Sequence, residues 1–264
     1  MNPPTRNPVQ AAYLDLLKRS LVNWIYHDIE RHELLRLGEY SLAKRLPFDT
    51  ALRRTGHDYS VQAHTLVGLE RLDNIQYCVE TVLSENIPGD LIETGVWRGG
   101  CCILMRGLLK AYGVEDRTVW AADSFQGLPK PNEQQYPADK GSRFHELDEI
   151  AVPLESVKDI FERYGLLDDQ VRFLKGWFRD TLPNAPINEL AVLRLDGDMY
   201  ESTIDVLRNL YYKVSPGGFV IIDDYGAYAA CRKAVHDFRD AHGVSEPIRE
   251  IDWTGVYWRK GVTP

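Results

Sequence analysis

The spacing of apolar residues changes near Asp90 and divides the chain into two kinds of predicted structure. Before it, residues 11–35 (AAYLDLLKRSLVNWIYHDIERHELL) and 60–86 carry apolar side chains at helical intervals, so we predict a helix in each segment. Residues 36–60 between them are charged and interrupted by proline and glycine, and we expect no long element there.

After Asp90, short apolar runs alternate with helical stretches. The predicted strands are residues 90–96, 117–125, 170–178, 190–198 and 217–225. The predicted helices are residues 99–114, 154–164, 201–214 and 229–243, and residues 248–260 suit a terminal hairpin. Strands separated by helices are joined by right-handed crossovers, so the predicted fold is α/β, with a doubly wound, mostly parallel sheet covered on both faces. Ligands of such folds gather at the carboxyl ends of the strands.

Length and composition fit one large globular domain. The 264 residues are 44% hydrophobic and 27% charged, which is enough to form a core without disulfides or a structural metal. We predict a core at residues 89–264 and an appended N-terminal helical cap, with a role in oligomerisation, at residues 1–88. Residues 127–150 are rich in glycine, proline and charge, and we predict an active-site lid there.

Charge and cysteine content exclude several classes of protein. The net charge of −8 argues against a nucleic-acid-binding face. No apolar run has the length of a membrane span and the N-terminus lacks a signal sequence, so we expect a cytoplasmic protein without membrane contact. The four cysteines form no C-x-x-C pair, and we expect them to be reduced and buried.

The first predicted strand runs into a glycine-rich turn, IETGVWRGG (residues 92–100), that precedes a helix. Glycine lets the backbone turn tightly and approach a ligand. The first glycine of the G-x-G-x-x-G fingerprint is Glu93 here, and an acid at that point repels a pyrophosphate, which argues against NAD or FAD. Glu93 suits a cationic amino group instead. Asp123, at the end of the second strand, suits ribose hydroxyls, and the combination points to S-adenosylmethionine.

The chain resembles the macrocin O-methyltransferase-like enzymes, which methylate sugar hydroxyls on antibiotics such as macrolides and aminocoumarins. The resemblance covers most of the chain and is specific in the following segments: AHTLVGLERLDNIQYCVE, LIETGVWRGG, ADSFQGLPKP, RYGLLDDQVRFLKGWFRDTLP, LAVLRLDGDMYEST and GGFVIIDDY. It implies a class I methyltransferase (Rossmann-like) fold, S-adenosylmethionine, a divalent cation (usually magnesium) and a homo-oligomer, dimeric or higher. The cofactor-binding residues that it implies are Thr65, Leu66, Glu93, Thr94, Gly95, Asp123, Ser124, Phe125, Trp177 and Phe178.

Aspartates close the fourth and fifth predicted strands. Asp196, Asp223 and Asp224 come after buried runs on neighbouring strands, and converging carboxylates repel one another unless a cation neutralises them. Hard divalent ions such as magnesium prefer oxygen ligands, and no Cys/His cluster is present to suggest zinc. We therefore predict that these aspartates bind Mg²⁺ or a similar ion.

A base must remove the proton of the acceptor hydroxyl, and the sequence leaves the choice open. Asp198 is the first candidate because it lies beyond Asp196 and is not needed for the ion. His145, in the predicted lid, has the more suitable unperturbed pKa. Asp196 itself is a third candidate, combining ligand and base.

The predicted activity is methyl transfer from S-adenosylmethionine to a sugar hydroxyl of a glycosylated natural product. The alternatives are an O-methyltransferase for a catechol-like or other vicinal diol, and a non-catalytic subunit that keeps the fold for assembly. Residues 36–60 and 127–150 are expected to select the acceptor. Candidate contacts to a bulky glycoside there are Tyr40, Arg45, Phe48, His57 and Tyr59.

Overall fold

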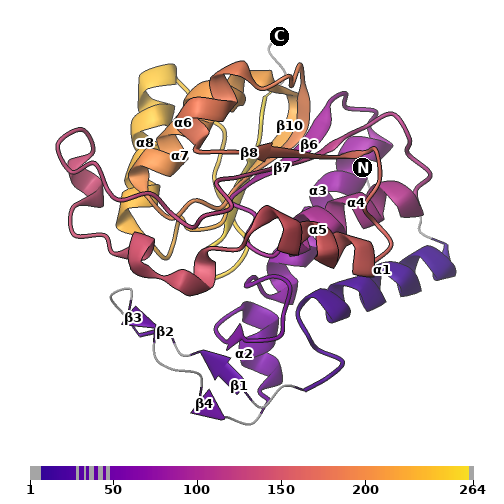
Figure 1. Cartoon of the computed structure of the whole chain (residues 1–264). Helices are drawn as coiled ribbons and strands as arrows, with labels where there is room; N and C mark the ends of the chain where they lie inside the picture. Colours follow the sequence, from indigo (N-terminus) through magenta and orange to yellow (C-terminus); the bar gives the residue numbers. More distant parts are fainter. Residues whose placement is uncertain are drawn as a thin grey trace.

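A seven-stranded sheet forms the centre of the molecule (Figure 1). The computed structural model describes residues 7–27, 30–32, 34–35, 39–40, 44–45 and 48–261. The strands of this sheet are β6 (Asp90–Thr94), β7 (Val119–Asp123), β8 (Val171–Lys175), β9 (Leu190–Leu195), β10 (Val214–Ile222), β11 (Arg249–Glu250) and β12 (Val256–Arg259). Their order is β11-β12-β10-β9-β6-β7-β8. Strands β6 to β10 are parallel, and the terminal hairpin adds β12 antiparallel to β10, so the predicted doubly wound sheet is confirmed.

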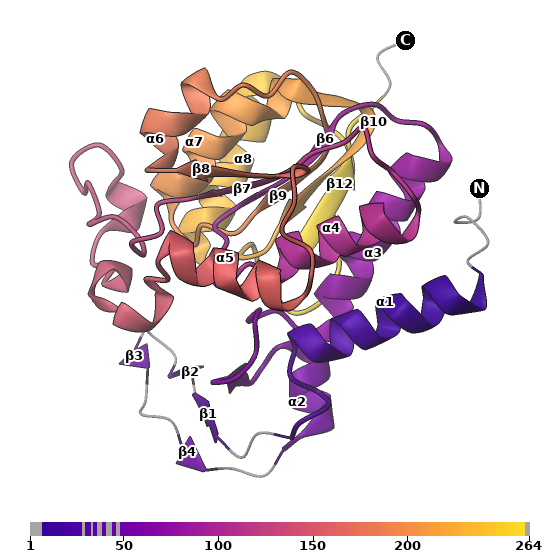
Figure 2. The ribbon, with the colours of Figure 1, turned by 45° about the vertical axis from the view of Figure 1, so that its right-hand side comes forward.

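Helices cover both faces of the sheet, as Figures 1 and 2 show. One layer holds α1 (Pro8–Leu21), α3 (Leu69–Ser84), α4 (Gly100–Ala111) and α5 (Leu154–Arg163), and the other holds α6 (Phe178–Thr181), α7 (Tyr200–Leu210) and α8 (Ala229–His242). Side chains of a strand alternate between the two layers. In β6, Leu91 packs into the core under α3 and α4, whereas its neighbour Ile92 packs into the core under α7 and α8. Both faces are apolar, which explains why the strands read as continuous hydrophobic runs.

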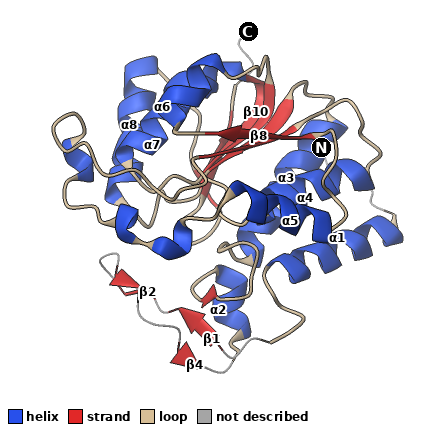
Figure 3. Ribbon diagram, in the orientation of Figure 1, coloured by secondary structure: helices blue, strands red, loops and turns tan. Residues whose placement is uncertain are grey.

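The first predicted helix is shorter in the structure. Helix α1 ends at Leu21, because Asn23 takes a positive φ of 50° and the N–H groups of Asn23 and Trp24 bond back to Ser20 O and Arg19 O. The prediction of a helix through residue 35 was therefore wrong. Short strands follow instead: β1 (Glu30–His32), β2 (Leu34–Leu35), β3 (Glu39–Tyr40) and β4 (Lys44–Arg45), with β5 (Tyr59–Ser60) and helix α2 (Thr50–Thr55) after them. Figure 3 shows these pieces on one side of the main sheet.

The N-terminal helices pack on the core. Helix α1 lies along α4, where the absence of a side chain at Gly107 makes room for Leu17: a Cβ there would lie 2.4 Å from Leu17 Cδ2. Helix α3, which starts at Leu69 rather than residue 60, packs against α4, β9 and β10. These helices of the predicted cap therefore contribute to the layer that covers one face of the sheet.

The predicted lid contains the short 3-10 helices η1 (Pro137–Asp139), η2 (Phe144–Glu146) and η3 (Asp148–Ile150). Asp139 is buried and accepts hydrogen bonds from the backbone N–H groups of Tyr200 (2.7 Å) and Glu201 (2.9 Å), at the start of α7. Near the other end, the indole N–H of Trp97 donates to Glu149 O over 3.0 Å. The segment is thus fastened to the elements that carry the carboxyl ends of β6 and β9.

The four cysteines are free and buried, as predicted. Within the described residues, no helix has the length and apolar character needed to cross a bilayer.

Candidate functional site

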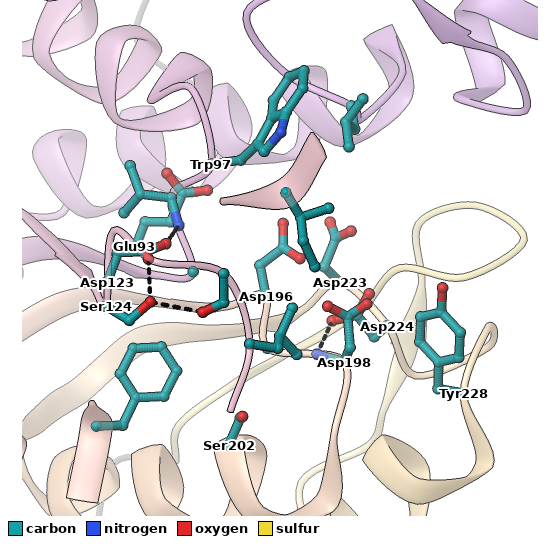
Figure 4. Close-up of a pocket in the computed structure, with 18 of the residues that line it drawn as sticks. Glu93, Trp97, Asp123, Ser124, Asp196, Asp198, Ser202, Asp223, Asp224 and Tyr228 are labelled. Atoms are coloured by element: carbon teal, nitrogen blue, oxygen red, sulfur yellow. Dashed lines mark hydrogen bonds between the residues drawn. The ribbon is translucent and has the colours of Figure 1, made fainter. Parts of the chain in front are cut away.

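A pocket lies where the strand order of the sheet reverses. Successive strands from β6 to β8 run outward in one direction, whereas β9 and β10 lie on the other side of β6, and α/β folds bind ligands in the crevice at this point. The predicted site residues that line the pocket are Thr65, Leu66, Glu93, Gly95, Asp123, Ser124, Trp177, Phe178, Asp196, Asp198, Asp223 and Asp224. Figure 4 shows the aspartates of β9 and β10 gathered on one side, with Asp123 and Ser124 on the other.

The turn after β6 requires glycine at its first position. Gly95 has a φ of +89°, and a Cβ there would lie 1.6 Å from Asp196 O. The backbone at Gly95 therefore passes directly against the loop after β9 that carries the aspartates, so packing within the protein already requires glycine at this position. Trp97, two residues on, also takes a positive φ of 47°, a conformation that is uncommon for a bulky residue.

Asp123 fixes the two loops that follow β6 and β7. Its Oδ2 accepts from the N–H of Val96 (2.6 Å) and its Oδ1 from the N–H of Phe125 (2.7 Å). Burial raises the pKa of Asp123, and these backbone hydrogen bonds act in the opposite direction. A carboxylate has about four acceptor positions, so Asp123 can accept further hydrogen bonds from a ligand in the pocket.

Glu93 is buried and has protein partners on both oxygens. Its Oε1 accepts from Arg194 Nη1 at 2.5 Å, and its Oε2 accepts from the N–H of Cys102 at 3.2 Å. Glu93 and Arg194 are register partners across β6 and β9, which explains the contact. Burial raises the pKa of Glu93 while Arg194 lowers it. Glu93, which is expected to face the cationic amine of a ligand, therefore also forms an ion pair with Arg194 inside the protein.

The predicted metal ligands converge. Asp196, Asp223 and Asp224 each offer one carboxylate oxygen, and these oxygens lie within 4.8 Å of one another. Burial, and then repulsion by neighbouring aspartates, holds the pKa values of Asp196 and Asp224 well above the ordinary value. Carboxyl pKa values raised in this way indicate that too little positive charge surrounds the cluster to offset the repulsion among its carboxylates.

Two buried arginines supply part of that charge. Arg194, which is fully buried, donates to Asp196 Oδ2 at 2.9 Å and also to Asp223 Oδ1. Arg71, from α3, donates to the other oxygen of Asp223 and to Asp252 Oδ2 at 2.9 Å. The expectation that only a divalent ion makes the crowded carboxylates tolerable is thus corrected, because two guanidinium groups share the task.

Asp224 has a different environment. Its Oδ2 accepts from the N–H of Asp198 at 2.9 Å, and among the described residues no guanidinium donates to it. Burial, and then repulsion by Asp223, raises the pKa of Asp198 itself to about 7. In the cluster of Asp196, Asp198, Asp223 and Asp224, two arginines therefore face four aspartates, and the remaining carboxylate oxygens form a donor set that a hard divalent cation prefers.

Three predicted residues do not line the pocket. Thr94 is buried, with its Oγ1 directed to Arg194 O at 3.3 Å. Phe125 packs against Phe173 and contributes its backbone N–H to Asp123. His145 lies in the lid, with its Nε2 3.8 Å from Glu146 Oε1, so it is not placed to act as a base in this arrangement.

Other lining residues were not predicted from the sequence. They include Arg71, Trp97, Arg179, Tyr228, Trp253 and Thr254. Arg194 donates hydrogen bonds to Asp196 and Asp223 although it does not line the pocket. Side chains two positions apart along an extended chain share a face, so the place of Arg194 two residues before Asp196 could have revealed this contact. The side chains of Tyr40, Arg45 and Tyr59 lie outside the described residues, whereas His57 packs against Trp253.

Sequence comparison matches most of the chain to one family model and to named O-methyltransferases. The sequence model of the macrocin-O-methyltransferase (TylF) family matches residues 10–260. The chain is 57% identical over 248 residues to the 8-demethyl-8-(2,3-dimethoxy-alpha-L-rhamnosyl)-tetracenomycin-C 4'-O-methyltransferase of Streptomyces olivaceus, covering 94% of this chain and 92% of that protein. It is 53% identical over 251 residues to the mycinamicin III 3''-O-methyltransferase of Micromonospora griseorubida, covering 94% and 96%.

A solved structure, that of the O-methyltransferase NovP, is similar along the whole chain. The TM-score is 0.88 at 48% sequence identity, and the match covers 96% of this chain and 100% of the other. The predicted class I methyltransferase fold is thereby confirmed.

Proposed function

Because this chain belongs to the macrocin-O-methyltransferase family, we propose that it methylates a sugar hydroxyl of a glycosylated natural product, using S-adenosylmethionine and a divalent cation. The chain is an O-methyltransferase, and the hypothesis of a non-catalytic subunit is therefore set aside. The observation that carries the proposal is the convergence of Asp196, Asp223 and Asp224 beside the Gly95 turn in one pocket.

The loops after β6, β7 and β8 would hold the methyl donor. Glu93 and the Gly95 turn receive the amino-acid end, and Asp123 accepts from the ribose hydroxyls. Trp177 and Phe178, which line the pocket after β8, flank the adenine ring. The residues proposed to hold the donor thus line the same pocket as the aspartates that follow β9 and β10.

Asp196, Asp223 and Asp224 would hold the cation. Their oxygens fit a hard ion in spacing and in chemistry, and the raised pKa values of Asp196 and Asp224 reflect repulsion that an ion would relieve. When bound, the cation supplies orientation of the acceptor oxygens and a lower hydroxyl pKa. Arg194 and Arg71 keep two of the three ligands oriented.

Asp198 is the proposed base. The residue lines the pocket next to Asp224 and beside the proposed cation site, so a carboxylate there can accept the proton of an acceptor hydroxyl. The acceptor oxygen forms a bond to the methyl carbon as the carbon–sulfur bond breaks. The electron pair of that bond stays on sulfur, and the hydroxyl proton passes to the Asp198 carboxylate.

The acceptor class is tested with the substrates that the relatives' names specify. Purified protein is incubated with S-adenosylmethionine, Mg²⁺ and either mycinamicin III, the demethyl tetracenomycin rhamnoside or catechol, and products are analysed by mass spectrometry and NMR. We expect a 14 Da gain on a sugar oxygen of a glycoside and loss of turnover in EDTA. Methylation of catechol alone would instead favour the vicinal-diol alternative, which the metal cluster by itself suits equally well.

We also propose that the protein is a homo-oligomer, as the family resemblance implies. Leu16 of α1 and the nearby Ile25 and Tyr26 are exposed apolar or aromatic side chains on the N-terminal segment. Light scattering after size-exclusion chromatography would give a mass at least twice the 30.2 kDa of one chain.

A further inference from the structure

A hydrogen bond joins the turn between β11 and β12 to Asp223, a candidate metal ligand. Thr254 Oγ1 donates to the backbone carbonyl of Asp223 over 2.8 Å. Asp252, two residues earlier, accepts from Arg71 Nε at 2.9 Å, and Arg71 also donates to the Asp223 carboxylate. The turn therefore has a fixed position relative to the carboxylate cluster.

Trp253 projects from this turn and is held on two sides. Its indole N–H donates to Thr55 O over 2.9 Å at the end of α2. Its ring centroid lies 4.5 Å from that of His57 at an interplanar angle of 32°, so the imidazole supports one side of the indole. Nevertheless, Trp253 is 41% exposed and lines the pocket. A large aromatic surface is thus kept in a fixed orientation at the pocket mouth.

A second aromatic residue, Tyr228, lines the same pocket. Tyr228 lies beside Asp224, as Figure 4 shows, and its backbone N–H donates to Asp224 O at 2.9 Å. Phe144 of the lid meets the Tyr228 ring edge-on, with centroids 5.0 Å apart. The pocket that holds the carboxylate cluster is therefore lined by an aromatic residue of the terminal hairpin and by the one that directly precedes α8.

Sugar rings match such a surface. A pyranose carries C–H groups on its faces and hydroxyls around its rim, and an aromatic face attracts the C–H groups while the hydroxyls remain free for polar partners. A ring stacked on Trp253 can therefore still direct rim hydroxyls toward the aspartates. Catalytic transfer depends on holding the acceptor in such a defined orientation.

We propose that Trp253 is a specificity-determining residue: its indole is the platform on which the sugar ring of the acceptor stacks, with His57 supporting it from behind. This inference rests on the proposed function, since it requires a glycoside acceptor. It adds an acceptor contact in the C-terminal hairpin to the regions, 36–60 and 127–150, from which acceptor selection was expected.

A second role for Trp253 must be distinguished, because the residue also joins the hairpin to α2. Three substitutions separate the two roles. Trp253→Phe keeps an aromatic face and loses the hydrogen bond to Thr55, Trp253→Leu keeps apolar bulk without an aromatic face, and Trp253→Ala removes both. Tyr212→Ala is the matched control, because Tyr212 is 62% exposed and is not among the lining residues of the pocket.

The test measures kcat and KM for the glycoside that the wild-type protein methylates, together with the calorimetric Kd of S-adenosylhomocysteine, the melting temperature and the oligomeric mass. We expect KM to rise at least tenfold in Trp253→Ala and Trp253→Leu, and less than threefold in Trp253→Phe and Tyr212→Ala. We expect kcat to stay within threefold, and the Kd of S-adenosylhomocysteine and the oligomeric mass to stay unchanged.

Several results would overturn the proposal. An unchanged KM in Trp253→Ala excludes a platform, and full activity in Trp253→Leu shows that apolar bulk alone suffices. A change of oligomeric mass in Trp253→Ala would make the residue part of a subunit contact. If the wild-type protein methylates neither glycoside, the proposed acceptor class is wrong and this inference is wrong with it. If the wild-type protein methylates a glycoside but KM is unaltered in Trp253→Ala, only the inference about Trp253 is wrong.

Discussion

Arg194 donates a hydrogen bond from Nη1 to Asp196 Oδ2 over 2.9 Å, so a candidate metal ligand has a cationic partner within the protein. The two residues are two positions apart in and just after β9, and their side chains share a face of the sheet. Because Arg194 is fully buried, the nearby carboxylates of Glu93, Asp196 and Asp223 compensate its charge. The protein thus holds its acidic cluster together with a guanidinium group and leaves Asp224 for other partners.

Removing this guanidinium should destabilise the fold. Arg194→Met leaves the buried Glu93 and Asp223 and the partly exposed Asp196 without their shared partner, and breaking a buried ion pair typically costs about 3–5 kcal/mol of unfolding free energy. Urea unfolding in EDTA would measure the loss. Arg163→Met is the control, since its ion pair with Asp159 is exposed and should be worth less than about 1 kcal/mol. Equal losses in both variants would contradict the role given to Arg194.

Magnesium should stabilise the protein more at high pH than at low pH. In the folded protein without an ion, the pKa values of Asp196 and Asp224 are raised, so folding takes up protons and stability declines as pH rises above the unfolded pKa of about 4. Mg²⁺ at a hundredfold excess over its Kd should then raise the melting temperature by roughly 5–10 °C at pH 8. At the same magnesium concentration, the rise in melting temperature should be smaller at pH 5.5.

Asp224→Asn is the matched variant for this measurement. It keeps the shape of the side chain and removes one ligand charge, so the magnesium-dependent rise at pH 8 should largely disappear. A rise of the same size in the variant, or a larger one at pH 5.5 in the wild-type protein, would show that the ion binds elsewhere.

The core of the fold could be predicted from the sequence because its information is local. The strands ending at Asp123, Asp196 and Asp223 are apolar runs followed by turn residues, and the crossover rule then places their carboxyl ends together. The end of α1 could not be predicted, since the apolar pattern continues past Leu21 while the backbone at Asn23 turns to positive φ. There, local backbone geometry overrides hydrophobic periodicity.

The carboxylates of the site could be predicted, but their partners could not. Asp196 and Asp223 are visible as strand-end acids, whereas Arg71 reaches Asp223 from a helix 152 positions away in sequence. Trp253 is equally remote, since its neighbours Thr55 and His57 belong to the N-terminal segment. Such contacts arise from tertiary packing and leave no periodic signal in the chain.

Asp198→Asn should distinguish the candidate bases. The change removes the proton acceptor while keeping the side-chain size, so kcat should fall by about 10²–10⁴-fold, typical of losing general base catalysis. The Kd of S-adenosylhomocysteine should be unaffected. His145→Ala should retain kcat within threefold, because His145 does not line the pocket. The reverse pattern of losses would assign the base to the lid.

Asp139→Ala should loosen the lid. The substitution leaves the N–H groups of Tyr200 and Glu201 without their buried acceptor, at a cost of about 1–3 kcal/mol. Hydrogen exchange across residues 127–150 should become faster and KM for the acceptor should rise. Asp180→Ala, at an exposed carboxylate, is the control, and exchange rates that match the wild-type protein in both variants would contradict the anchoring role.

The position of the ion is the most direct test of the account. Crystals grown with Mn²⁺ and S-adenosylhomocysteine would be measured for anomalous scattering from manganese. The prediction is one strong peak within about 2–2.5 Å of carboxylate oxygens of Asp196, Asp223 and Asp224, beside the bound nucleoside. No peak among these side chains in crystals of a protein that is active in solution, or a nucleoside bound away from the Gly95 turn, would contradict it.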